Sequence, residues 1–556
     1  MGEIICKGRG RRDEFMPFHL YKRRIVIAVC SIFVICIMLI VRLYTLAMGQ
    51  NPALEVLSGQ YTRKNTVLRR DGFVYDTRGE LLSHKHDGAV VIVKPGAKAD
   101  RNRVVGYLSD FSGYGFEELL EKYNKMIPFT LKLESIPEKT PPEGVYIYPS
   151  YALSENSFCR HILGFRNSDG KGVSGILSCY GDTLEGYSGS ISYKYTANAR
   201  GGVLEGGSFY IEDRNYSTKG GIVLTLDGKL QSEVDGICDR YMDMGAVVIS
   251  EISTGNILAL SSRPLYNRDD VASSLASERG ELINRAFSLY TPGSVFKAVV
   301  AAAALEKDER LYEFEYECTG ECDVSGKIFR CHEKDGHGVQ TMKSAFANSC
   351  NTYFINLLQE TGFEYVLTLC NRMGLGNPYS VDGLYVDGAN MPDYGKAYPD
   401  AYKANFAFGQ GELLMSCMDV LNIYSVCASG CGRDFSLVKG ISDMEAVSFK
   451  GKDARRILSE GTVLKMRELM KECVTSGTGK EASVKGISVG GKTATAQSGQ
   501  IKKGTEVLHK WFAGVFPIDE PRYAIAVLCD GNGENNANPK KIFGLCAECV
   551  AEIYDN

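Results

Sequence analysis

The chain has 556 residues, of which 44% are hydrophobic and 23% are charged, and its formal net charge is −4. This length allows three or more domains with large cores, since a typical domain holds about 100–200 residues. A small negative net charge indicates no excess of basic residues that could bind the phosphates of DNA or RNA, so we expect no nucleic-acid partner.

The first predicted element is a membrane anchor at residues 25–48. Ile25 to Val41 is an unbroken run of 17 apolar or small residues, and residues 43–48 extend it past Arg42. Seven Lys and Arg residues precede the run, against three Asp and Glu residues. Residues 1–24 are therefore predicted to form a basic cytoplasmic tail, with everything after residue 48 outside the cell membrane.

A cleaved signal peptide and a lipoprotein are the alternatives to a retained anchor. No Ala-x-Ala cleavage site follows the apolar run, and Val29 before Cys30 is a poor lipobox residue. These features favour a single-pass anchor that stays in the mature protein.

Two folded regions are predicted after the anchor. Residues 49–218 are rich in Gly, Tyr and Ser and contain short alternating runs such as Ala89 to Val93, which indicates an extended β-rich module. Residues 219–556 alternate strand-like runs with long helical stretches, for example Arg455 to Val474, which indicates a mixed α/β (α+β) domain.

The tetrad Ser294-Val-Phe-Lys297 places a hydroxyl and an amine three residues apart, before an apolar run that is predicted to be a buried helix. Residues at i and i+3 share a helix face, so the Lys297 amine can act as base for the Ser294 hydroxyl. Pro292 and Gly293 mark a turn that delivers Ser294 at a helix N-terminus, where free backbone N–H groups can face a developing oxyanion.

Two further polar elements follow in the chain. Ser349-Cys-Asn351 supplies a hydroxyl and an amide, and Lys492-Thr-Ala-Thr495 supplies an amine and two hydroxyls on a strand-like run. The alternatives are that Ser349 and Asn351 only cap a helix beginning near Thr352, and that Lys492 is a solvated strand residue.

Ser-x-x-Lys, then Ser-x-Asn, then Lys-Thr-Gly is the motif set of penicillin-binding proteins and serine β-lactamases. The segments around residues 70–79, 170–175, 408–411 and 476–479 are similar to further family motifs. From about residue 20 to its end, the chain resembles a class B penicillin-binding protein, a monofunctional peptidoglycan D,D-transpeptidase.

The resemblance implies a fold and a reaction. Residues 49–218 would be the family's pedestal domain, and residues 219–556 its transpeptidase domain, an antiparallel five-stranded sheet flanked by helices. Ser294 would attack the penultimate D-alanine of a stem peptide and expel the terminal D-alanine, or be acylated by a β-lactam. A neighbouring stem peptide would then resolve the acyl-enzyme and close a cross-link.

The resemblance also implies a role for each polar residue, and no cofactor. Lys297 would be the base, made neutral by burial and by the Lys492 ammonium. Ser349 would relay a proton to the leaving amine, and Asn351 would bind Lys297 and the substrate amide. The substrate carboxylate would be held by Lys492, Thr493 and Thr495, with the oxyanion on the backbone N–H groups of Ser294 and Thr495.

Other functions of this fold stay open from the sequence. A D,D-carboxypeptidase or a β-lactam-hydrolysing enzyme would use the same Ser-Lys site, and a non-catalytic scaffold or sensor would only bind penicillin. A class B protein has no glycan-polymerising domain, so the resemblance implies a multi-spanning glycan polymerase as partner. Elongation, division and sporulation roles are not distinguished.

Ala494 departs from the family pattern, which mostly has glycine at this position. A Cβ there is expected to project along the strand that binds the substrate or a β-lactam, and so to hinder close approach. We expect this methyl group to affect the binding of β-lactams more than catalysis.

Eighteen cysteines are present, and those that concern the site lie between the first two motifs. Cys318, Cys322, Cys331, His332 and His337 form a cluster of ligand-like residues. A structural zinc site is one interpretation, but the spacings match no common zinc finger. The sequence therefore favours free thiols or a Cys318–Cys331 disulfide, and it predicts no metal.

Overall fold

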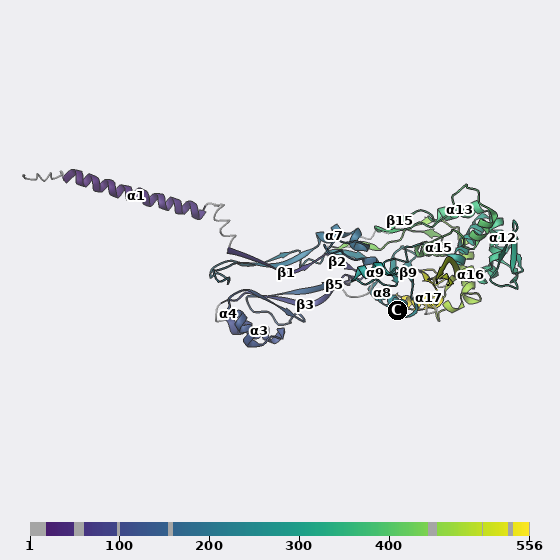
Figure 1. The fold of residues 1–556 in the computed structure, drawn as a ribbon, viewed down its shortest axis with the longest axis horizontal. Coiled ribbons are helices and arrows are strands. Elements are labelled where there is room, and N and C mark those ends of the chain that lie inside the picture. The colour runs from purple at the N-terminus through teal and green to yellow at the C-terminus, as the bar shows by residue number, and fades with distance from the viewer. Residues whose placement is uncertain are drawn as a thin grey trace, which may run out of the picture.

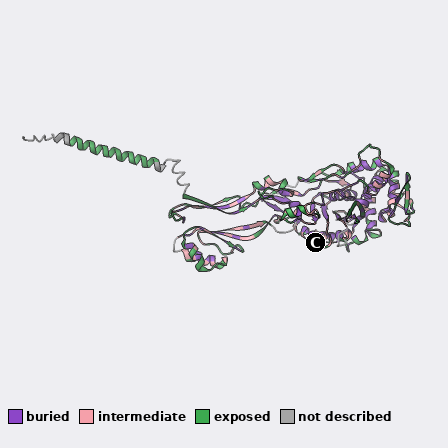
Figure 2. Cartoon of the chain, viewed as in Figure 1, coloured by how far each residue is buried: buried purple, intermediate pink, exposed green. Residues whose placement is uncertain are grey.

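The structure is a computed structural model that describes residues 18–48, 61–96, 100–153, 159–268, 270–442, 453–502, 504–531 and 537–554. Most of the predicted basic tail lies outside these residues. Helix α1 spans Phe18–Met48, and an 18-residue window within its segment Lys22–Thr45 has a mean hydropathy of 3.0 with no residue buried. Figure 2 shows this helix exposed over Lys22–Thr45, as expected for a segment that contacts lipid.

The N-terminal module is strand-rich, as predicted. One sheet has the order β1 (Thr62–Arg70), β6 (Gly189–Thr196), β7 (Phe209–Arg214), and a second has the order β4 (Phe129–Leu133), β3 (His84–Val93), β5 (Val145–Leu153). Helices α3 (Arg101–Ser112) and α4 (Phe116–Asn124) share a core with the second sheet. In Figure 1 the long strands β1 and β3 run between the α3–α4 end and the region of β9.

Arg70, the last residue of β1, connects several segments of this module by hydrogen bonds. Its side chain is 5% exposed, and its guanidinium donates hydrogen bonds to the backbone carbonyls of Asp71, Tyr187, Asn215, Tyr216 and Thr218. A planar cation with five donors can satisfy several carbonyls at once, and this accounts for arginine at the first position of the 70–79 motif. Three short helices follow in the same module: α5 (Arg160–Leu163), α6 (Gly175–Cys179) and α7 (Gly181–Gly186).

The border between the two predicted domains is crossed by a small sheet. Strand β8 (Gly221–Leu224) pairs in parallel with β2 (Phe73–Tyr75) and antiparallel with β18 (Val438–Ser442). Asp227 then caps helix α8 (Gly228–Tyr241) and also accepts hydrogen bonds from Arg78 Nε at 2.8 Å and Tyr554 Oη at 2.9 Å. A buried carboxylate with these partners joins the 70–79 motif to both ends of the C-terminal domain.

The C-terminal domain is built on a five-stranded antiparallel sheet, as the family resemblance implied. Its strands are β10 (Ile257–Arg263), β9 (Gly245–Glu251), β22 (Tyr523–Asp530), β21 (Thr505–Phe516) and β20 (Gly490–Lys502), in that order. Strand β20 is at the edge, so among the described residues no strand pairs with one of its sides.

Alternate residues of β9 pack on opposite faces of this sheet, which follows from the two-residue period of a strand. Val247 and Ile249 join the core formed with α8 and the C-terminal helix α17 (Pro539–Tyr554). Ala246 and Val248 join the larger core that contains α10 (Lys297–Lys307) and α15 (Cys417–Ser429).

The remaining elements complete the domain, most of them around the larger core, while Ala482 of the 3-10 turn Lys480–Ala482 packs in the smaller one. The helices are α9 (Val271–Ala276), α11 (Met342–Ala347), α12 (Asn351–Thr361), α13 (Phe363–Arg372), α14 (Asp400–Ala407) and α16 (Glu460–Thr475), with 3-10 turns η3 (Glu309–Glu313) and η4 (Lys480–Ala482). Two-stranded pairs are formed by β11 (Tyr316–Cys318) with β14 (Gly338–Gln340), β12 (Glu321–Val324) with β13 (Lys327–Arg330), β15 (Tyr379–Val381) with β16 (Leu384–Val386), and β17 (Cys431–Gly432) with β19 (Arg455–Arg456). The helix predicted from Arg455 therefore begins five residues later, because Ser459 caps it by accepting the Thr462 N–H.

Candidate active site

Ser294 lies in a tight turn directly before the buried helix. Residues Gly293–Phe296 form a 3-10 turn, η2, and the α-helix itself begins at Lys297. Gly293 has φ +58°, and a Cβ built on it would lie 2.9 Å from Ala496 Cβ on strand β20. Glycine is therefore required for this turn to approach the strand, and the approach places Ser294 beside the sheet edge.

Lys297 is fully buried and is held by the Ser-x-Asn motif. Its Nζ donates to Ser349 O at 2.6 Å, to Asn351 Oδ1 at 2.8 Å and to Ser349 Oγ at 3.3 Å. Burial, and then the nearby Lys492 charge, hold the pKa of Lys297 well below its usual range. A lysine with a lowered pKa can be neutral at ordinary pH and can accept a proton.

The Ser-x-Asn segment is a strained bend rather than a simple helix cap. Ser349 has φ +59°, a conformation that costs free energy for a residue other than glycine. Helix α12 begins at Asn351, and its N-cap residue Cys350 makes no side-chain capping hydrogen bond. The helix-capping alternative for Ser349 and Asn351 is therefore not supported, and both side chains are used at Lys297 instead.

Lys492 is fully buried on edge strand β20, so the solvated alternative for it is wrong. Its Nζ donates to Thr493 O at 3.1 Å, and burial lowers its pKa. Thr493 Oγ1 is 2.7 Å from Thr478 Oγ1 of the segment 476–479, and Thr478 N donates to Ala347 O, just before the Ser-x-Asn bend. These contacts link the strand motif to the second motif through residues that the sequence only marked as family-like.

The Ala494 methyl group does not point where the sequence analysis predicted, which was along the substrate-binding side of the strand. Its side chain is 6% exposed and belongs to the larger core, although the residue also borders the cleft. A Cβ built on Gly293 would lie 3.4 Å from Ala494 Cβ. The methyl group thus faces the turn that carries Ser294 more than it faces the open groove.

The motif residues meet at a cleft of about 1020 Å³. Its lining includes Ser294, Ser349, Asn351, Thr493, Ala494 and Thr495. Lys297 and Lys492 lie behind this lining, where they contact it without reaching solvent. The three motifs predicted from the sequence to act together are therefore brought together by the fold.

Two residues that the sequence analysis gave no role position the nucleophile turn. His509 Nδ1 accepts the Thr291 N–H at 3.2 Å, and Trp511 Nε1 donates to Thr291 O at 3.0 Å. Both are buried on β21, and burial lowers the pKa of His509, which favours the neutral acceptor form. Gly293 N also donates to Gly409 O at 2.8 Å, so the backbone before Ser294 is fixed from two sides.

Trp511→Phe is expected to slow acylation of Ser294 by penicillin roughly fivefold, because it removes one buried hydrogen bond of about 1 kcal/mol to the Thr291 carbonyl. Stopped-flow measurement of the second-order acylation constant checks this. An unchanged constant in a variant with a lowered melting temperature would mean that the indole supports folding only.

Comparison with known proteins identifies the family. Residues 245–545, which are more than half of the chain, match the penicillin binding protein transpeptidase domain. The chain belongs to this family. Its fold resembles that of penicillin-binding protein PBP2 from Helicobacter pylori, in a complex with MreC, with a TM-score of 0.61, 22% identity and coverage of 89% of this chain and 99% of that chain.

Two curated relatives share this domain. Stage V sporulation protein D of Bacillus subtilis is 30% identical over 414 residues, covering 72% of this chain and 62% of the relative. Peptidoglycan D,D-transpeptidase FtsI of Buchnera aphidicola is 23% identical over 559 residues, covering 93% of this chain and 91% of the relative. The chain spans about 60% of the length of the first curated relatives that it matches.

Proposed function

We propose that this protein is a peptidoglycan D,D-transpeptidase that cross-links stem peptides through an acyl-enzyme on Ser294 and is acylated by β-lactams. The observation that carries the proposal is the environment of Lys297. The Lys297 amine is fully buried, its pKa is lowered, and it donates hydrogen bonds to Ser349 and Asn351. It lies behind a cleft that Ser294 lines, so it is suited to proton transfer.

In the first half-reaction, neutral Lys297 takes the proton of the Ser294 hydroxyl. The Ser294 oxygen attacks the carbonyl of the penultimate D-alanine, and the bond to the terminal D-alanine breaks. Ser349, whose Oγ lies 3.3 Å from Lys297 Nζ, passes the proton on to the leaving amine. An ester on Ser294 and free D-alanine are the products.

Strand β20 binds the substrate in this proposal. The exposed side of this edge strand offers the hydroxyls of Thr493 and Thr495 to the substrate carboxylate, and Lys492 supplies positive charge from behind. The backbone N–H groups of Ser294 and Thr495 stabilise the oxyanion. In the second half-reaction an acceptor amine attacks the ester, loses a proton and returns Ser294 to its free hydroxyl.

The reaction class is tested by giving the purified protein a stem pentapeptide donor together with an amine acceptor. A transpeptidase releases one D-alanine for each cross-linked product. Release of D-alanine without cross-linked product, at every acceptor concentration, would indicate a D,D-carboxypeptidase. Slow loss of the fluorescent penicillin label from the enzyme would exclude efficient β-lactam hydrolysis. Labelling by penicillin without any peptide product would indicate a penicillin-binding scaffold or sensor.

The placement of this activity is also a proposal. Helix α1 anchors the protein in the cell membrane with its N-terminus cytoplasmic, and residues 49–218 act as a pedestal for the transpeptidase domain at 219–556. The apolar composition of α1 and the strand-rich module support this arrangement.

A multi-spanning glycan polymerase is proposed as partner, because a class B penicillin-binding protein cross-links glycan strands that another enzyme polymerises. The polymerase should co-purify with the full chain from membranes and be lost when residues 20–48 are replaced by an unrelated spanning segment. Normal cell-wall synthesis after that exchange would contradict a role of the anchor in recruitment.

Ala494→Gly is expected to speed acylation by bulky β-lactams more than by small ones, by roughly tenfold, because one methyl group is typically worth about 1–3 kcal/mol of discrimination. The methyl group lies against Gly293, so its removal lets the Ser294 turn and the strand adjust to a larger acyl group. Acylation constants for one small and one bulky compound check this. Equal rates in both proteins would make the alanine a silent variation.

A further inference from the structure

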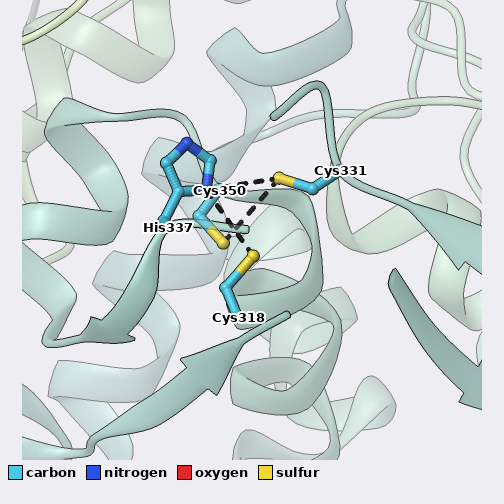
Figure 3. A group of neighbouring side chains, drawn as sticks. All are labelled: Cys318, Cys331, His337 and Cys350. Carbon is cyan, nitrogen blue, oxygen red and sulfur yellow. Dashed lines mark hydrogen bonds between the residues drawn. The ribbon is translucent and has the colours of Figure 1, made fainter. Parts of the chain in front are cut away.

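Four possible metal ligands converge directly behind the active-site cleft. They are Cys318, Cys331, His337 and Cys350, and their ligand atoms all lie within 4.8 Å of one another. Figure 3 shows the three sulfur atoms and the imidazole pointing toward a common centre. The ligands come from the end of β11, the residue after β13, the residue before β14 and the Ser-x-Asn bend.

The distances between these atoms suit a tetrahedral ion. A tetrahedral zinc ion with Zn–S of about 2.3 Å and Zn–N of about 2.0–2.1 Å places two sulfurs about 3.8 Å apart and a sulfur and a nitrogen about 3.6 Å apart. His337 Nδ1 lies 3.6 Å from Cys318 Sγ and 3.5 Å from Cys331 Sγ, and the Cys331 and Cys350 sulfurs are 4.0 Å apart. Ordinary packing does not require this agreement.

A disulfide explains the cluster less well. A disulfide needs an S–S distance of about 2.05 Å, and the Cys331 and Cys350 sulfurs are 4.0 Å apart, while Cys318, Cys331 and Cys350 are all free thiols. The sequence left free thiols and a Cys318–Cys331 disulfide open for this segment, and the structure has free thiols at both residues. The compact set also differs from the cluster seen in the sequence, since it lacks Cys322 and His332 and gains Cys350.

The backbone around the cluster is folded tightly enough to hold the ligands in place. Cys331 N donates to Gly320 O at 2.8 Å, and Cys318 pairs with Gly338 across β11 and β14. Gly336 has φ +80°, and a Cβ on it would lie 2.1 Å from Cys318 O. Cys318 and Cys350 are 1% and 0% exposed, so these two sulfur atoms are shielded from solvent, while Cys331, at 6%, borders the cleft.

We infer that Cys318, Cys331, His337 and Cys350 bind one zinc ion, which fastens the Ser-x-Asn bend to the β11–β14 region. Three cysteines and one histidine are a common closed ligand set of structural zinc sites. Binding converts three thiols to thiolates and releases three protons to solvent, while the histidine binds as the neutral imidazole. All four positions are filled by protein, so the ion itself has no open site for substrate.

The position of Cys350 gives the ion a role at the active site, and this part rests on the proposed function. Its two neighbours, Ser349 and Asn351, are the residues that hold Lys297. Asn351 Nδ2 also donates to Arg330 O at 3.4 Å, and Arg330 and Cys331 line the cleft. A metal–thiolate bond at Cys350 would hold the strained Ser349 backbone and so keep both side chains at Lys297.

The site is tested first by metal content. Cells are grown with ZnCl2, and the full chain is purified in detergent with a thiol reductant. Inductively coupled plasma mass spectrometry should then find about one zinc per chain. Cys350→Ala and His337→Ala should lose most of it. Cys322→Ser is the matched control, because Cys322 is close in sequence but outside the cluster, and it should retain the zinc. Wild-type protein without zinc, or ligand variants that keep it, would overturn the inference.

A second measurement does not depend on variants that fold poorly. Exchange of the wild-type protein with CoCl2 should give the intense visible bands of a tetrahedral cobalt site and thiolate-to-cobalt charge-transfer bands. Octahedral cobalt spectra without charge transfer would exclude the thiolates as ligands. Mass spectrometry of the unreduced protein that found a disulfide among these cysteines would also overturn the assignment.

The effect on the active site is tested by chelation. Zinc removal should slow penicillin acylation of Ser294 by about 10²-fold, the loss expected when a catalytic group moves by roughly 1 Å, and ZnCl2 should restore it. Equal acylation of the zinc-loaded and zinc-free protein would overturn the positioning role but leave the proposed function intact. Absence of acylation in the zinc-loaded protein would instead contradict the proposed function, with the metal content still deciding the site.

Discussion

Ser294→Ala is expected to abolish covalent labelling by β-lactams and to lower cross-linking by a factor of about 10⁴ or more. Ser294 lines the cleft on the turn before α10, and the alanine methyl has no oxygen to form the acyl-enzyme. Loss of the nucleophile removes the covalent route and leaves only binding and oxyanion stabilisation, as in other serine enzymes. Fluorescent penicillin labelling and single-turnover cross-linking measure the two effects.

Ser349→Ala provides the matched control for this prediction. It removes a hydroxyl from the same cleft and leaves Ser294 in place, so the adduct should still form on the peptide that contains Ser294, at a lower rate. Peptide mass spectrometry after digestion locates the adduct. Label that persists in Ser294→Ala, or an adduct found on Ser349, would contradict the assignment of the nucleophile.

The parts of the fold and site that depend on local sequence were predictable. The apolar run predicted helix α1, the alternation around Ala89 predicted β3, and the family resemblance implied the five-stranded sheet flanked by helices. The three motifs do meet in one cleft. This grouping followed from the family resemblance, in which the three motifs occur in this order and share one site.

The parts that depend on long-range pairing were not predictable from one sequence. Thr291 is fixed by His509 and Trp511, which are 218 and 220 residues away, so nothing near the tetrad reveals the contact. Parallel pairing of β2 with β8 likewise crosses the border that composition placed at residue 218. Neither local propensity nor hydrophobic periodicity records which distant strand becomes a neighbour.

The cysteine cluster illustrates the same limit within a motif. In the sequence, Cys350 is only the middle residue of Ser-x-Asn, while Cys322 and His332 lie close to Cys318, Cys331 and His337. Cys322 pairs with Phe329 in the hairpin β12–β13 and is outside the compact set, while Cys350, next to the bend at Ser349, belongs to it. Sequence distance was therefore a poor guide to distance in space.

Lys492→Met is expected to move the acid limb of the acylation pH profile to higher pH. Only neutral Lys297 can accept the Ser294 proton, so the rate rises with pH through the Lys297 pKa and then levels off. Burial and the Lys492 charge both lower the pKa of Lys297. Replacing Lys492 by Met removes its positive charge and leaves burial alone to lower the pKa of Lys297, so this pKa rises. On the acid side of the limb, the fraction of neutral Lys297, and with it the rate, then falls about tenfold for a pKa higher by one.

Lys492→Arg separates this electrostatic effect from substrate binding. Arginine keeps the positive charge, since its pKa is above about 12, and the limb should stay where it is in the wild type even if the plateau falls. Lys297→Arg, in contrast, should lose about 10²- to 10⁴-fold at every pH, because a guanidinium does not become neutral to act as base. Stopped-flow acylation with penicillin between acid and alkaline pH measures all three variants. An unmoved limb in Lys492→Met with a reduced plateau would mean that burial alone lowers the Lys297 pKa and that Lys492 acts only on the substrate carboxylate.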